Sequence, residues 1–67
     1  MTRIFCGKVT VDLLIYYVYR DEETPYSIWV NPSLKPDNIF KHPDFVARTN
    51  EEAVQLAPEL IRKLKSK

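Results

Sequence analysis

The sequence predicts a small α+β domain, in which a three-stranded, mainly antiparallel sheet carries one C-terminal helix on one face. Three features support this fold class. Residues 13–19 are apolar, β-branched or aromatic, residues 26–30 alternate in hydropathy, and residues 49–64 have helical periodicity. A chain of 67 residues has room for one hydrophobic core. We therefore expect a single domain over residues 1–67.

The first part of the chain favours β-structure. Residues 3–20 are expected to form a strand, either continuous or interrupted, because β-branched and aromatic types dominate its second half. Gly7 is the only glycine of the chain and predicts a bulge or bend. The polar segment Asp21–Pro25 predicts a turn. Residues 26–30 should then return antiparallel to the first strand.

A proline-rich segment follows. Residues 31–43 contain three of the five prolines and predict a long, stiffened loop. The loop is expected to be held down by three apolar side chains, those of Leu34, Ile39 and Phe40. Residues 45–48 should form a short third strand.

The C-terminal segment has the pattern of a capped amphipathic helix. Thr49 and Glu52 have capping-box spacing, so each side chain should accept a hydrogen bond from the backbone N–H of the other. The apolar stripe comprises Ala53, Leu56, Ala57, Leu60, Ile61 and Leu64. Pro58 predicts a kink or a restart. The basic residues at 62–67 complement the helix dipole.

Residues 13–19 are apolar at both alternating sets of positions. One set is Leu13, Ile15, Tyr17 and Tyr19, and the other is Leu14, Tyr16 and Val18. One helix can cover only one face of a sheet, so the second face needs another cover. Two interpretations are open: the loop 31–43 covers it, or a protein partner or second copy does.

We expect the uncovered face to be the partner-binding site, with Leu14, Tyr16, Val18 and Trp29 as apolar anchors. Tyrosine and tryptophan are the residue types that most often dominate binding energy at protein interfaces. If Tyr16 faces a partner, Tyr16→Glu should break assembly without unfolding the monomer.

Composition argues against several other functions. The formal net charge is +1, which gives no support to nucleic-acid binding, and the basic tail is explained by helix capping. Cys6 is the only cysteine and His42 the only histidine. An internal disulfide and a tetrahedral cysteine zinc site are therefore excluded, and we expect no enzyme activity, no cofactor and no metal.

The same residues bear on localisation. Lys8 and Asp12 precede any long apolar run, which is unlike a signal peptide. The longest apolar run is about seven residues, far below the ~20 that a membrane-spanning helix needs. The cytoplasm is the expected location, and no membrane association is expected.

The run Thr49-Asn50-Glu51-Glu52-Ala53, followed by Ala57 and Ile61, resembles the strand-to-helix junction of HicB-like antitoxin domains. That resemblance implies a partial ribonuclease-H-like ββ-β-α domain that binds and blocks a small toxin and oligomerises. The residues themselves favour a small non-enzymatic protein-binding module, acting as a regulator, an inhibitor or an accessory subunit. A HicB-like antitoxin or nucleic-acid-associated regulator is the alternative.

Overall fold

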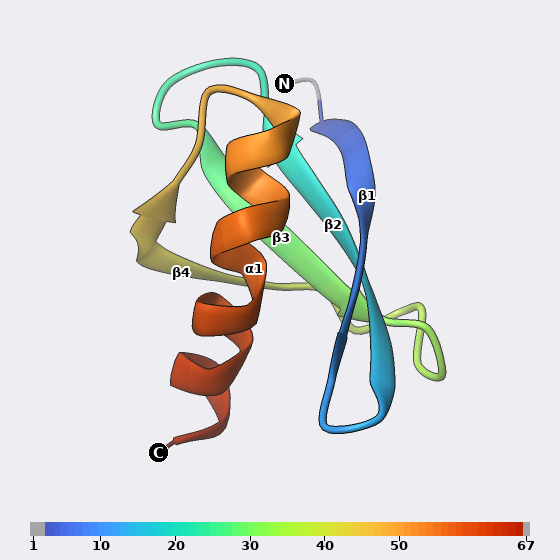
Figure 1. Ribbon diagram of the computed structural model, residues 1–67. Helices are drawn as coiled ribbons and strands as arrows, with labels where there is room; N and C mark the ends of the chain where they lie inside the picture. The colour runs from blue at the N-terminus through green and yellow to red at the C-terminus, as the bar shows by residue number, and fades with distance from the viewer. Residues whose placement is uncertain (1–2, 67) are drawn as a thin grey trace.

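The computed structural model describes residues 3–66 and shows a four-stranded antiparallel sheet with a helix packed against one face (Figure 1). The strands follow chain order across the sheet, so each is hydrogen-bonded to its sequence neighbours. The elements are β1 (Arg3–Val11), β2 (Leu14–Asp21), β3 (Ser27–Pro32), β4 (Phe40–Val46) and α1 (Asn50–Lys65). The predicted α+β class and C-terminal helix are confirmed. Lys67, the last residue of the predicted basic tail, lies outside the described residues.

The sheet has four strands rather than the expected three, because residues 3–20 form a hairpin of two strands, β1 and β2. Val11 pairs with Leu14, and the two residues between them, Asp12 and Leu13, have φ of 53° and 68°. A turn with positive φ at both central positions matches the right-handed twist of the flanking strands. Asp-Leu is not a typical sequence for this turn, which is why the sequence pattern did not indicate a hairpin.

The second difference is in the proline-rich segment. Its end forms β4, so strand structure begins at Phe40 and the loop covers only residues 33–39. The predicted third strand at 45–48 overlaps β4 at residues 45–46 only, and residues 47–48 lie in the connection to α1. Pro43 is tolerated within β4 because this is an edge strand, where one side has no neighbour to receive a hydrogen bond.

The predicted irregularity at Gly7 is confirmed as a β-bulge. Phe5 pairs with Tyr19 and Gly7 with Val18, which leaves Cys6 as the extra residue of β1. Gly7 has φ of 153°, and a Cβ at this position would lie 3.2 Å from Val54 Cγ2 in the helix. Glycine therefore allows close approach of α1 to β1.

Helix α1 begins with the predicted cap. The Glu52 backbone N–H donates to Thr49 Oγ1 at 3.1 Å. The Glu52 carboxylate accepts from the Arg48 backbone N–H at 3.1 Å, one residue before the expected donor. Pro58 lies inside the helix without dividing it, so the predicted restart does not occur.

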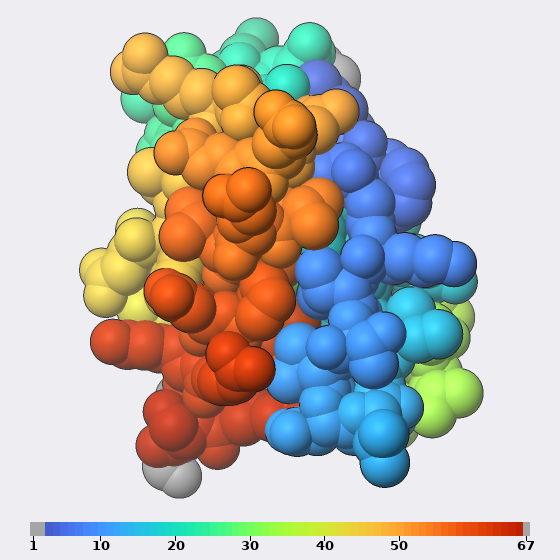
Figure 2. Space-filling model, in the orientation of Figure 1, coloured from blue at the N-terminus to red at the C-terminus, as the bar shows by residue number. Residues whose placement is uncertain are grey.

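The core lies between α1 and one face of the sheet. Strands β2 and β3 contribute fully buried Val18, Ile28 and Val30, and the helix contributes Ala53, Ala57, Leu60 and Ile61. The two alanines have small side chains, which lets the helix lie close to the strands. Figure 2 shows the helix beside the β1–β2 hairpin on this side of the molecule.

Helix α1 is the one helix in residues 3–66, and it is neither long enough nor apolar enough to cross a membrane.

Candidate functional site: the open face of the sheet

The strand register assigns each side chain to one of the two faces. Phe5 pairs with Tyr19, Tyr19 with Trp29, and Trp29 with Lys41, so one residue from each strand forms a continuous row. Directly paired residues project to the same side of a sheet. This row lies on the side away from α1, which we call the open face. The register places on it the side chains of Arg3, Phe5, Lys8, Thr10, Ile15, Tyr17, Tyr19, Asp21, Trp29, Asn31 and Lys41.

Three of the four predicted anchors lie on the opposite side. Tyr16 and Val18 have exposed fractions of 6% and 0% and belong to the core beneath the helix. Leu14 is half-buried and packs against the same core. The expectation that these three face away from the helix is wrong. Trp29 does lie on the open face, and Val18 has no surface to offer a partner.

The error has a simple physical reason. Alternation in β2 separates its residues into two sets, but both sets are apolar, so alternation does not tell which set meets the helix. The deciding information is in β3, where Ile28 and Val30 alternate with the more polar or amphipathic Ser27, Trp29 and Asn31. Antiparallel pairing places Val18 beside Val30, so the β-branched face is the buried one.

The open face carries an aromatic cluster, defined as Phe5, Tyr17, Tyr19 and Trp29. The Phe5 ring packs edge-on against Tyr17 at 6.3 Å and against Tyr19 at 5.5 Å between centroids. Such T-shaped contacts are the favoured geometry for aromatic pairs. Phe5 is nevertheless 54% exposed, since β1 is an edge strand and no further strand covers its outer side.

Trp29 is held in place from several directions. Its indole N–H donates to Asp21 Oδ1 at 3.0 Å, and Asp21 is itself only 2% exposed. The Arg3 guanidinium lies 4.3 Å and the Lys41 amine 5.0 Å from the centre of the indole ring. These are cation–π distances, so the Trp29 ring interacts with two cations within the chain.

The charge of the open face is positive. Arg3, Lys8 and Lys41 are exposed, whereas the one carboxylate that the register places there, Asp21, is buried and bonded to Trp29. The chain as a whole has a net charge of only +1. The positive charge of this face therefore results from how the fold distributes the charged residues.

The side chains expected to hold the loop 33–39 against the sheet do not do so. Leu34, Ile39 and Phe40 are 77%, 36% and 43% exposed, so their predicted role as loop anchors is wrong. Asn31 instead holds the loop, since its Nδ2 donates to the Pro36 carbonyl at 3.2 Å. Asn31 Oδ1 is buried with no hydrogen-bond partner.

His42 makes only local contacts. Its Nδ1 accepts from the Asp44 backbone N–H at 3.1 Å, and its ring packs edge-on against Phe45. Within residues 3–66, no three His, Cys, Asp or Glu side chains are grouped closely enough to hold a metal ion.

Cys6 lies in the bulge at the start of the sheet. Burial raises the pKa of its thiol, and the nearby Arg20 guanidinium opposes this only in part. A raised pKa keeps the thiol protonated at neutral pH, which disfavours its use as a nucleophile.

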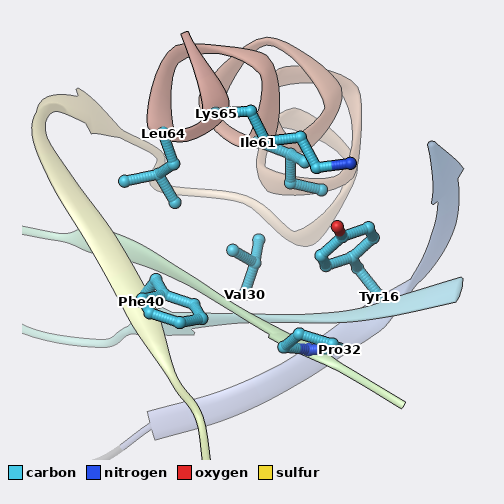
Figure 3. A pocket seen from close by; sticks show the side chains of 7 residues that line it. All are labelled: Tyr16, Val30, Pro32, Phe40, Ile61, Leu64 and Lys65. Carbon is cyan, nitrogen blue, oxygen red and sulfur yellow. The ribbon is translucent and has the colours of Figure 1, made fainter. Parts of the chain in front are cut away.

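A pocket of about 320 Å³ opens on the helix side of the sheet (Figure 3). It lies between the last turns of α1 and the neighbouring ends of the strands. Its lining consists of Tyr16, Val30, Pro32, Phe40, Ile61, Leu64 and Lys65. The sequence pattern did not indicate this pocket, because its walls come from segments far apart in the chain.

Comparisons with known protein families, with curated proteins and with solved structures found no match. The resemblance to HicB-like antitoxins therefore rests on the Thr49–Ala53 junction and the helix that follows it.

Proposed function

We propose that this chain is a small non-enzymatic protein-binding module and that the open face is its binding surface. The observation that supports this most directly is the aromatic cluster on the open face, in which Phe5 contacts Tyr17 and Tyr19 and Trp29 lies against the cations of Arg3 and Lys41. Tryptophan, tyrosine and arginine are the types enriched among residues that dominate interface energy. Trp29 and its neighbours are already fixed by contacts, so little ordering entropy would be lost on binding.

The charge of the surface favours a partner that presents acidic and apolar side chains. Arg3, Lys8 and Lys41 would face carboxylates and increase the association rate. Two copies meeting through this face would bring the same cations together, which is unfavourable. A different protein is therefore the preferred partner, and the resemblance to HicB-like antitoxins would make that partner a small toxin.

The geometry favours a protein over a single-stranded nucleic acid. Bases bind such sheets by stacking on exposed ring faces. Here Arg3 and Lys41 already lie over the Trp29 ring, and Phe5 meets the tyrosines edge-on. Three cations also provide few phosphate contacts.

The test compares two substitutions to aspartate, each at an exposed, large apolar residue. Phe5→Asp places a carboxylate within the cluster, whereas Leu13→Asp places the same charge at the hairpin turn, where the side chain is 96% exposed. A partner captured from the native source would be identified, purified and titrated by calorimetry. We expect Phe5→Asp to weaken binding at least tenfold and Leu13→Asp to leave it unchanged.

Three results would contradict the proposal. The first is equal binding by both variants. The second is that the partner captured from the native source is digested by nuclease, which would favour the nucleic-acid alternative. The third is a concentration-dependent dimer in sedimentation that Phe5→Asp abolishes, which would identify a second copy as the partner.

A further inference from the structure

The pocket on the helix side is separate from the open face and has the features of a small-molecule site. Its volume of about 320 Å³ lies at the lower end of the range for ligand pockets, roughly 300–1,000 Å³. Most of its lining is apolar, and two polar groups, the Tyr16 hydroxyl and the Lys65 amine, lie together on one side (Figure 3). Apolar walls with a few convergent polar groups are the usual composition of such sites.

The pocket has a fixed floor and an accessible mouth. Val30 and Ile61 are 0% and 2% exposed, so the bottom of the pocket belongs to the rigid core. Phe40 and Leu64 approach from the strand and the helix, and Phe40 is 43% exposed. A ligand could therefore bury an apolar tail against the core without opening the fold.

The polar side of the pocket carries one ammonium group, that of Lys65, which forms an exposed ion pair with Asp12. Lys65 Nζ lies 5.8 Å from the centre of the Tyr16 ring and donates to Asp12 Oδ2 at 3.3 Å. The hydrogen bond to Asp12 and the nearby Tyr16 raise the pKa of Lys65, and the amine is charged at neutral pH. Asp12 is its one carboxylate partner in the described part of the chain, and both side chains are well exposed. Exposed ion pairs of this kind are weak, so another carboxylate can compete for the amine.

From these contacts we infer that the pocket binds a small amphipathic monocarboxylate, with its apolar tail between Phe40 and Leu64 and its carboxylate on Lys65 Nζ and the Tyr16 hydroxyl. The charge complementarity of Lys65 selects the acid over a neutral molecule of the same shape. This inference does not depend on the proposed function, because its residues lie on the other side of the sheet.

The test uses octanoate as the probe and octan-1-ol as the neutral control, titrated into the full chain and followed by amide chemical shifts in ¹H–¹⁵N spectra. We expect saturable shifts with octanoate that centre on Val30, Phe40, Ile61 and Leu64. Lys65→Gln should weaken octanoate binding about fivefold, because a charged hydrogen bond is replaced by a neutral one. Asp12→Asn should strengthen binding about twofold, because it releases the amine from its ion pair.

Both substitutions are at exposed positions, and Asn tolerates the positive φ of position 12, so folding should be retained. Phe5→Asp on the open face should leave octanoate binding unchanged, which separates this site from the proposed protein interface. Absence of saturable shifts below the micelle concentration would overturn the inference. So would shifts centred on the open face, equal binding of octan-1-ol, or an Asp12→Asn variant that binds more weakly.

Discussion

At the scale of single residues, the fold depends on a few side chains in unusual surroundings. A side chain at Gly7 would crowd Val54 of α1, and the buried carboxylate of Asp21 is satisfied by the hydrogen bond it accepts from the Trp29 indole. Leu13 is different. It occupies a left-handed conformation that suits glycine or asparagine, and it is 96% exposed. Nothing in the structure explains why a leucine stands at this position.

Leu13 leads to a prediction about stability. Leu13→Gly should raise the free energy of unfolding by about 0.5–1 kcal/mol, since the strain of a left-handed leucine, roughly 1–2 kcal/mol, exceeds the added entropy of a glycine in the unfolded chain. Urea denaturation followed by circular dichroism would measure the change. Leu13→Ala is the control, because alanine keeps the Cβ and should give little gain.

At the scale of elements, α1 is the part best specified by its own sequence. Its start combines the Thr49 cap with Glu51 and Glu52 in the first turn, and its last turn is basic. Its N-terminal end is also joined to the sheet, because Arg20 Nε donates to Asn50 Oδ1 at 2.7 Å. The helix therefore has both local and tertiary support at the same end.

Thr49→Ala should lower the free energy of unfolding by about 1 kcal/mol, because the Glu52 backbone N–H loses its acceptor. Thr49→Ser keeps the hydroxyl and should stay within a few tenths of a kcal/mol of the original. Thermal and urea denaturation of both variants would check this. An alanine variant as stable as the serine variant would show that the observed cap contributes nothing.

At the scale of the whole molecule, the sheet has two apolar faces with different roles. The helix covers the face that contains Val18, Ile28 and Val30, and it leaves the aromatic cluster and the surrounding cations on the other side. A thin domain of this kind has a small stability margin, so the core face tolerates little change. On the open face, in contrast, Phe5 is 54% exposed and lies outside the core.

The two faces should respond differently to the same kind of substitution. Tyr16→Glu should unfold the protein or cost about 3 kcal/mol or more, because it replaces a core ring by a carboxylate at a site that is only 6% exposed. Phe5→Asp should cost about 1 kcal/mol, since it removes partly exposed edge contacts. Denaturation of both variants with calorimetry would measure the two costs. Equal costs would contradict the assignment of the two faces.

The sequence alone determined the α+β class, the C-terminal helix with its threonine cap, the bulge at Gly7 and the separation of residues 13–19 into two apolar sets. All of these follow from local chemistry, because capping, glycine geometry and side-chain alternation involve residues close together in the chain.

The tertiary structure decided which apolar set meets the helix, where the hairpin turns, and that residues 40–46 form a strand. It also decided that Arg3, Trp29 and Lys41 meet on one face and that Phe40, Leu64 and Lys65 enclose a pocket. The physical reason is that, apart from the local hairpin turn with its untypical Asp-Leu sequence, these features depend on pairing or packing between segments far apart in the chain. The local sequence around a residue on one strand does not predict which side chain antiparallel pairing will place beside it.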